Sequence, residues 1–235
     1  MRAGVTVSWL TKLEQGRAQS VSKEVLDALA DALLLDDTER SHLYTLAGLR
    51  PEPDLDRHGD RDTHGCTITP ALGALLDALE PNPAYILDRA WDVVAFNEAE
   101  AALFPALLGY TDAPANLLEL VFCNEDLRDL MVDHDHEAAR LVAQLRVHHT
   151  EWPRDRELHD RITRLVDESE LFGRLWAAND VAPFESTRRE FDHPTAGRLE
   201  FDHHRFAILD QPGTQLVVYT PIPGSDSAVR LRRSR

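Results

Sequence analysis

Apolar residues recur at helical spacing in two stretches of the first fifty residues. Over residues 23–33 they form one face, which predicts an amphipathic helix with Ser22 as its cap. Asp36 and Glu39 have the spacing of a capping box, so a second helix should follow and end at Gly48. This part of the chain is therefore expected to be entirely helical.

A further helix is expected earlier, within Val5–Arg17. Thr6 can cap it, Leu10 and Leu13 lie on one face, and Gly16 suits a left-handed end. Its outward side chains are short or basic and are suited to base edges and phosphates. The predicted DNA-binding residues are Thr6, Val7, Ser8, Thr11, Lys12, Gln15 and Arg17.

Periodicity disappears between residues 49 and 68, where proline and charged residues predominate and large apolar residues are few. This composition is typical of an exposed linker. Thr69 and Pro70 then start a helix with a stripe of leucines, because proline is favoured at the first helical position.

After residue 83 the pattern changes to short apolar runs, then to helical periods, and finally to period two. The first two runs predict a hairpin that leads through Asn97 into a helix, as at the start of a PAS-like sensor domain. The expected helices are Glu98–Leu108, Glu137–His149, Arg156–Val166 and Leu171–Ala178. The expected strands are Ala84–Leu87, Asp92–Phe96, Thr187–Asp192, Arg198–Leu209 and Gln215–Ile222.

Five strands interrupted by helices suit one antiparallel sheet with helices packed on a face. The predicted fold class is α+β, with an all-α helix-turn-helix remnant followed by a PAS-like domain built on that five-stranded sheet. The domains are expected at 1–48 and 69–229, joined by the linker at 49–68. Residues 230–235 are basic without apolar partners and are expected to be a frayed tail.

Charge is unevenly distributed along the chain. The net charge is −16, yet residues 1–50 hold six basic and seven acidic side chains, so the acidity belongs to the remainder. This argues against a general nucleic-acid binder and leaves DNA contact to a local basic edge, which a dimer would double. Two cysteines without metal-type spacing, no signal-peptide pattern and no membrane-length apolar run predict a cytoplasmic protein without membrane contact.

Short matches in the same order through most of the chain carry a family resemblance. VTVSWLTKLEQGR, from Val5, resembles the turn and second helix of a Cro/repressor-type helix-turn-helix. PNPAYILDRAWDVVAFNEAEAALFP, from Pro81, and FDHPTAGRLEFDHHRFAIL, from Phe191, resemble the MmyB-like transcription regulators. The resemblance implies DNA binding, usually as a homodimer, a PAS-like domain with a fatty-acid-like ligand, and no turnover. It also implies two helices before residue 5, so the head is expected to be truncated or its start set too late.

Clusters of titratable residues are weaker candidates for chemistry. Asp133–Glu137 lacks the paired-histidine spacing of a zinc helix, so a solvated helix start is the simpler interpretation. His203 and His204 are neighbours in a predicted strand, so only one of them can face the core. The sequence has no G-x-S-x-G, phosphate-binding loop or dinucleotide fingerprint. We therefore predict no enzyme activity, no catalytic residues, no metal and no cofactor.

A sensor for an apolar ligand needs an apolar cavity with a few polar groups at its mouth. Basic or amide side chains would bind a carboxylate head group, and aromatic rings would border the cavity. Ordinary core packing is the simpler alternative for any one of these residues. The predicted ligand-binding residues are Arg89, Trp91, Phe96, Asn97, Arg146, His149 and Trp176. The predicted apolar lining is Ile86, Val94, Phe96, Leu141, Leu145, Phe172, Trp176 and Val218.

The predicted function is therefore a DNA-binding transcription regulator whose PAS-like domain senses a small hydrophobic, fatty-acid-like ligand. Its expected partners are double-stranded DNA, that ligand and a second copy of the chain in a homodimer. The alternative is a stand-alone ligand-binding or dimerisation protein whose DNA-binding head does not function. An enzyme in the sensor part would need an acid/base pair in a cleft, and the sequence indicates no such pair.

Overall fold

The computed structural model describes residues 21–47, 66–153, 155–178, 180 and 187–234. By its contacts the chain divides into two compact units, Met1–Asp60 and Arg61–Arg235, and the boundary in the sequence falls within the expected linker. The predicted DNA-binding residues all lie outside the described residues: Thr6, Val7, Ser8, Thr11, Lys12, Gln15 and Arg17.

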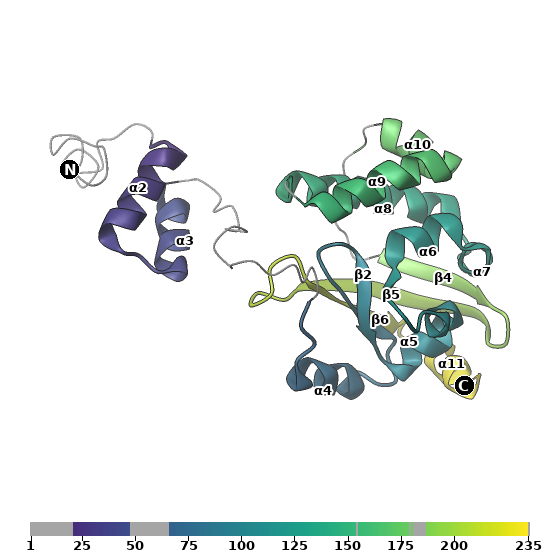
Figure 1. The fold of residues 1–235 in the computed structure, drawn as a ribbon. Coiled ribbons are helices and arrows are strands. Elements are labelled where there is room, and N and C mark those ends of the chain that lie inside the picture. Colours follow the sequence, from purple (N-terminus) through teal and green to yellow (C-terminus); the bar gives the residue numbers. More distant parts are fainter. Residues whose placement is uncertain (1–20, 48–65, 154, 179, 181–186, 235) are drawn as a thin grey trace. The chain divides into compact units, whose positions relative to one another are not determined.

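The first unit contains the helices α2 (Lys23–Leu33) and α3 (Asp37–Leu46), drawn in purple in Figure 1. Helix α2 has the predicted bounds, although Ser22 at its N-cap makes no side-chain cap bond. The predicted capping box is confirmed, because Asp36 accepts from the Glu39 backbone N–H at 2.8 Å and the Glu39 side chain bonds in return.

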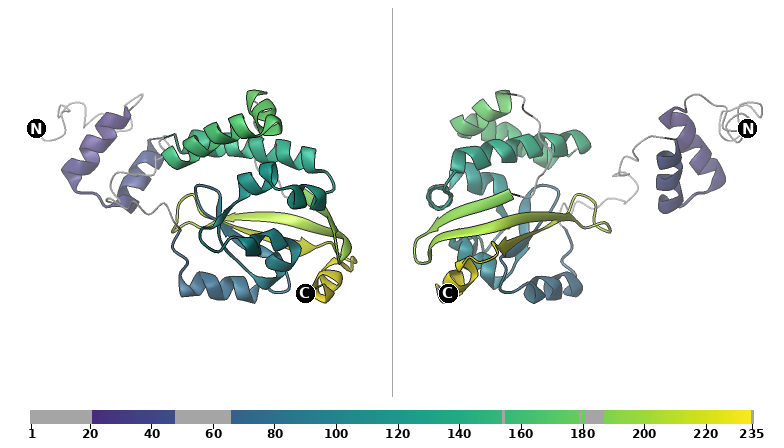
Figure 2. Two further views of the ribbon diagram at one scale, coloured as in Figure 1. Left: turned by 45° about the vertical axis from the view of Figure 1, so that its right-hand side comes forward. Right: turned by 180° about the vertical axis from the view of Figure 1, so that it is seen from behind.

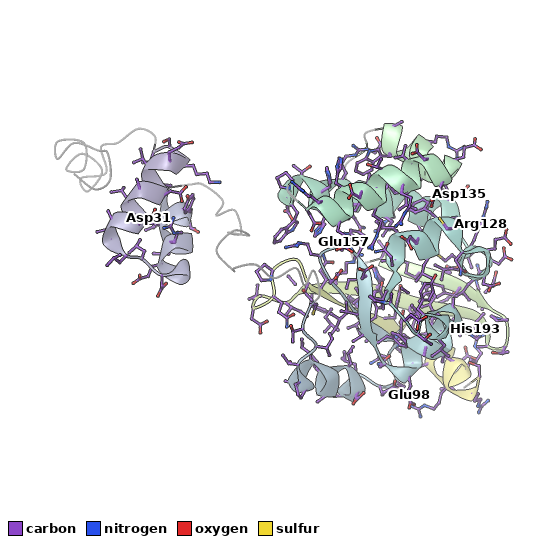
Figure 3. The ribbon with its side chains drawn as sticks, in the orientation of Figure 1. Asp31, Glu98, Arg128, Asp135, Glu157 and His193 are labelled. Carbon is purple, nitrogen blue, oxygen red and sulfur yellow. The ribbon has the colours of Figure 1, made fainter. Side chains whose placement is uncertain are left out.

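Arg40 holds α3 against α2. Its guanidinium donates to Asp27 at 2.8 Å and to Asp31, which is labelled in Figure 3. The Tyr44 hydroxyl donates to the same Asp27 carboxylate at 2.6 Å. Arg40 and Tyr44 are both buried, so polar contacts as well as the apolar face of α2 fix this helix pair.

The second unit is built on one antiparallel sheet of six strands in the order β3-β2-β1-β6-β5-β4. The first hairpin therefore lies beside the last strand. Five of the strands are those the sequence predicts, and β3 is additional because two residues are too short for alternation to show. The strands are β1 (Ala84–Leu87), β2 (Asp92–Phe96), β3 (Ala115–Asn116), β4 (Thr187–His193), β5 (Gly197–Ala207) and β6 (Gln215–Pro221).

The two faces of the sheet are covered by different helices, as the two views of Figure 2 show. Alternate strand residues point to opposite faces. On the inner face, Tyr85, Phe191 and Tyr219 belong to the main apolar core. This core continues into helices α6 (Leu117–Cys123), α8 (His134–Glu151), α9 (Arg156–Glu168) and α10 (Glu170–Ala177). On the outer face, Ile86 packs beneath Leu76 of helix α4 (Pro70–Ala78).

Local sequence sets where the helices of this unit begin. Thr69 caps α4 and Asn97 caps α5, as predicted, each accepting a backbone N–H three residues on. The expected helix 98–108 is interrupted because Pro105 cannot donate a helical hydrogen bond, and a 3-10 turn follows. The helices are α4 (Pro70–Ala78), α5 (Glu98–Leu103), η1 (Pro105–Gly109), α6 (Leu117–Cys123), α7 (Glu125–Leu130), α8 (His134–Glu151), α9 (Arg156–Glu168), α10 (Glu170–Ala177) and α11 (Ser227–Arg233).

The expected frayed tail at 230–235 is wrong over most of its length. Residues 227–233 form α11, which packs against β5 and α5. The helix is held by Leu231, which is 1% exposed, and by Ser227, whose hydroxyl accepts from the Glu200 backbone N–H at 2.9 Å. A single leucine among arginines is a weak sequence signal, but here it fills a site in the core. In the described part of the chain, no helix combines the length and apolarity that a membrane span needs.

Candidate ligand-binding site

The turn between β1 and β2 holds Trp91 in a strained conformation. Its φ angle is +69°, a left-handed value that a bulky side chain adopts only when its surroundings enforce it. The Trp91 ring is 2% exposed and packs with the apolar residues of the helical layer (α6, α8, α9 and α10). Strain of this kind costs about 1–3 kcal/mol and is common where a ligand binds.

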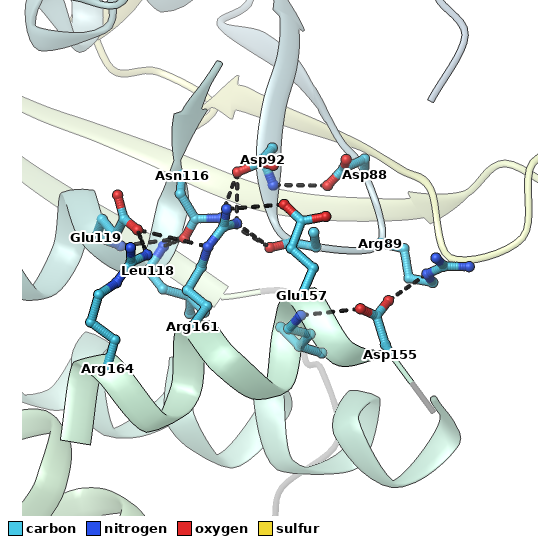
Figure 4. Close-up of polar contacts among 12 residues, drawn as sticks. Asp88, Arg89, Asp92, Asn116, Leu118, Glu119, Asp155, Glu157, Arg161 and Arg164 are labelled. Atoms are coloured by element: carbon cyan, nitrogen blue, oxygen red, sulfur yellow. Dashed lines mark hydrogen bonds and ion pairs between the residues drawn. The ribbon is translucent and has the colours of Figure 1, made fainter. Parts of the chain in front are cut away.

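Arg161 on α9 enforces that turn through a polar cluster, shown in Figure 4. Its guanidinium donates to the Ala90 carbonyl at 2.9 Å and to the Asp92 carboxylate at 2.7 Å. The Asn116 amide donates to the same two oxygens, at 2.9 and 2.8 Å. We call Arg161, Asn116 and Asp92 the Arg161 clamp. Arg161 and Asn116 hydrogen-bond Ala90 and Asp92, which are the residues on either side of Trp91.

The inner face of the sheet carries a second polar cluster, in which Arg189 and His203 are buried and Arg205 is partly buried. Arg189 on β4 and His203 and Arg205 on β5 lie there, and we call these three residues the arginine site. The His203 ring lies 4.9 Å from the ring of Tyr219, and the phenols of Tyr219 and Tyr85 hydrogen-bond each other. Charged and polar groups here share a face with the aromatic core.

Burial controls the charge of this cluster. It lowers the pKa of both Arg189 and Arg205, and it holds the pKa of His203 well below its ordinary value, with the nearby Arg189 adding to that effect. His203 is therefore neutral at pH 7, whereas arginine remains charged. Burial also raises the pKa of Tyr85 to about 12 and raises that of Tyr219. These tyrosines stay protonated, so the arginine site is cationic.

Helix α8 and Trp91 enclose the arginine site from above. Glu137 forms an ion pair with Arg189, and both side chains are largely buried. The guanidinium of Arg205 donates to the Gln144 amide oxygen at 3.1 Å and lies 4.9 Å over the Trp91 ring. The strained tryptophan thus borders the cationic site directly.

The structure separates the predicted ligand-binding residues into three places. Arg146, His149 and Trp176 come together between α8 and α10, where the Arg146 guanidinium lies 4.2 Å over the Trp176 ring. Arg89 lies at the Trp91 turn and pairs with Asp155 at 2.5 Å.

Phe96 and Asn97 lie apart from both groups. Phe96 lines a surface pocket of about 340 Å³ at the edge of the sheet. The Asn97 side chain bonds the backbone of Ala84, Glu100, Leu76 and Asn82, which fastens α5 and α4 to the sheet.

The predicted apolar lining cannot enclose one cavity. Ile86, Val94 and Val218 lie on the outer face beneath α4, whereas Leu145 and Phe172 belong to the helical layer above the inner face. The sheet stands between the two sets because successive strand residues point to opposite faces.

The arginine site is not among the predicted ligand-binding residues, although the period-two alternation of β5 contains a signal for it. Leu199, Phe201, His203 and Arg205 are in phase along β5, and the first three are buried. The expectation that only one of His203 and His204 faces the core is confirmed, since His204 instead bonds Thr220 on the outer face. A charged residue in phase with buried aromatics was the available clue.

The acidic and histidine-rich run at 133–137 is partly buried rather than a wholly solvated helix start. His134 is 8% exposed and its Nε2 donates to the Val121 carbonyl oxygen at 2.7 Å, which ties α8 to α6. Among the described residues, no group of three or more His, Cys, Asp or Glu side chains is placed to hold a metal ion.

Asp88, in the Trp91 turn, makes stability depend on pH. Its carboxylate is 5% exposed and accepts from the Asp92 backbone N–H at 2.9 Å, and burial raises its pKa to about 6 from 3.8. The folded state therefore holds this proton more tightly than the unfolded state does. The contribution is fully present below about pH 4 and is lost as the pH rises towards 6.

We expect Asp88→Asn to remove that loss, because the amide oxygen still accepts the hydrogen bond. The free energy of unfolding at pH 8 should rise by up to about 3 kcal/mol relative to the unsubstituted protein, with little difference at pH 4. Urea unfolding at both pH values measures this, and Asp129→Asn, at an exposed carboxyl on α7, should give no such difference. An equal shift at both pH values would show that Asp88 does not titrate as described.

Two family models match the sequence. The model described as MmyB-like transcription regulator ligand binding domain matches residues 68–233, and the model described as Helix-turn-helix domain matches residues 1–43. No individual curated protein matches the chain at a significant level. The first match covers more than half of the chain and includes the whole arginine site and the Arg161 clamp. The matches are to regulator modules rather than to enzymes.

Proposed function

Because the chain belongs to the MmyB-like transcription regulators, with a helix-turn-helix domain for DNA and a ligand-binding domain, we propose that it senses a small hydrophobic carboxylic acid of the fatty-acid kind. The observation that carries the proposal is the arginine site, two guanidiniums and a neutral imidazole set among aromatic rings. Glu137 already pairs with Arg189, and a ligand carboxylate beside Arg205 would offset the desolvation of that second guanidinium through charge-assisted hydrogen bonds.

The apolar body of such a ligand would lie between the inner face and the helical layer. Leu117, Phe122, Leu141 and Leu175 pack against both apolar clusters there. Two surface pockets, of about 410 and 340 Å³, are lined by other residues than these arginines. The ligand would therefore enter by moving α8 and α10 away from the sheet, as a PAS-like sensor that responds to its ligand requires.

Mass spectrometry of the purified, denatured protein tests the ligand class. We expect release of a stoichiometric acid with a chain of roughly 12–18 carbons, the size that fills an apolar site of a few hundred Å³. The same analysis of a heat-treated, delipidated sample reloaded with palmitate should recover one acid per chain. Failure of the delipidated protein to take up palmitate or any shorter fatty acid would contradict the proposal.

Operator binding separates the regulator from a stand-alone sensor with a non-functional head. A dimeric regulator should have twice the 26.5 kDa chain mass in sedimentation and should select a palindrome from random DNA at low salt. A protein that dimerises and takes up the acid yet selects no DNA sequence would favour the stand-alone alternative.

A further inference from the structure

The turn between β5 and β6 contacts Cys66 and Thr67, the first residues of the second unit that the structure describes. In this turn, the Gln211 amide donates to the Thr67 carbonyl oxygen at 3.1 Å and accepts from the Cys66 thiol at 2.9 Å. Thr214, which is 4% exposed, also hydrogen-bonds Cys66. In the sequence, Cys66 directly follows the segment that comes from the DNA-binding head. Gln211 therefore fixes the first described residues of the ligand-binding domain to the β5–β6 turn.

The same turn also contacts the Trp91 turn. Gly213 has a φ of +86°, and a Cβ added there would lie 3.0 Å from the Arg89 Cβ and 3.3 Å from the Trp152 ring. Only glycine tolerates both the backbone conformation and this close approach. The backbone of the β5–β6 turn at Gly213 therefore packs closely against both Arg89 and Trp152.

Arg89 is linked to the arginine site through two rings. His148 Nε2 donates to the Arg89 carbonyl oxygen at 2.9 Å, and the His148 ring meets the Trp91 ring edge-on at 6.0 Å. The Arg205 guanidinium lies over the same Trp91 ring, 4.9 Å from its centre. Arg205 is also two residues from the end of β5, so it reaches the turn along the strand as well.

From this contiguous set of contacts we propose that the β5–β6 turn transmits occupancy of the arginine site to Cys66 and Thr67, with Gln211 as the positioning residue. The inference rests on the proposed function, since it takes an anion at Arg205 as the input. An anion that draws the Arg205 guanidinium from the Trp91 ring alters the packing of His148 and Arg89, and Gly213 passes the change to Gln211. Packed elements of this kind shift between discrete arrangements.

The reactivity of the Cys66 thiol measures the contact with Gln211 directly, because the thiol donates a hydrogen bond to the Gln211 side chain. In the full-length chain carrying Cys123→Ser, iodoacetamide should label Cys66 at a rate that palmitate changes at least about fivefold, the lower range of measured coupling between sites. In the Gln211→Ala variant, palmitate should change the Cys66 labelling rate by less than about twofold. The palmitate affinity of this variant, measured by calorimetry, should stay within about threefold of that of the parent. Leu209→Ala is the matched control, because Leu209 lies in the same turn, is 91% exposed, and should leave the palmitate response intact.

A second experiment, without ligand, tests the proposal independently of which acid the ligand-binding domain binds. Arg205→Met should change the Cys66 labelling rate at least about fivefold when Gln211 is present and less than about twofold in Gln211→Ala. If the effects of the two substitutions simply multiply, the turn does not transmit and the proposal is overturned. If they couple but palmitate does not bind, the transmission stands and the proposed ligand class fails. A parent protein that binds palmitate with no change at Cys66 would also overturn the transmission.

Discussion

Arg205→Met is expected to weaken palmitate binding by about 100-fold, an effect of roughly 3 kcal/mol that is typical for removing one partner of an enclosed charge pair. Arg205 is partly buried, donates to Gln144 and lies over Trp91, so a carboxylate placed there is shielded from water. Methionine keeps much of the side-chain volume and removes the charge. Isothermal calorimetry of the delipidated, full-length protein measures the change.

The same substitution should leave the free energy of unfolding of the ligand-free protein unchanged or raise it. Replacing an enclosed charge by an apolar side chain of similar volume is often neutral or stabilising. Arg198→Met is the matched control on the same strand, because Arg198 is half exposed and pairs with Asp192 and Glu190 at the surface. If Arg205→Met binds palmitate with an affinity within threefold of that of the unsubstituted protein, Arg205 is not part of the binding site.

Elements with a strong apolar period were predictable from the sequence, and elements defined by tertiary contact were not. Helix α2 and strand β2 have the predicted bounds, because each carries its own complete pattern. Strand β3 has only two residues, and its pairing with Asp92 and Val93 of β2 is a property of the folded sheet. Helix α11 depends on the place that Leu231 finds in the core, which no local pattern encodes.

The candidate site follows the same division. Trp91 was predicted to border the ligand from its place in the hairpin turn, but its left-handed backbone could not be foreseen, because non-glycine residues rarely adopt it. The side chains that enforce it, Asn116 and Arg161, come from 25 and 70 residues further along the chain. The arginine site is similar, since Glu137 of α8 meets Arg189 of β4 only after the helical layer has packed on the sheet.

Arg161→Met should lower the free energy of unfolding by about 3–5 kcal/mol, the range measured when one partner of a buried ion pair is removed. The Asp92 side chain is largely buried, and Arg161 supplies its charged partner at 2.7 Å while also bonding the Ala90 carbonyl (Figure 4). Without Arg161, only the neutral Asn116 amide compensates the desolvation of the Asp92 carboxylate, and the strained Trp91 turn loses one of its two supports. Urea unfolding at pH 7, with the slope compared between variants, measures the loss.

Arg164→Met provides the matched control one turn further along α9. The Arg164 side chain is 51% exposed and the side chain of its carboxylate partner, Glu119, is 35% exposed, so the expected loss is no more than about 1 kcal/mol. Adding Asp92→Asn to Arg161→Met should recover part of the stability, because an amide in that site carries no charge that needs a partner. If Arg161→Met and Arg164→Met destabilise equally, Arg161 contributes no more than a surface ion pair, and the conformation of Trp91 must be enforced by Asn116 and apolar packing.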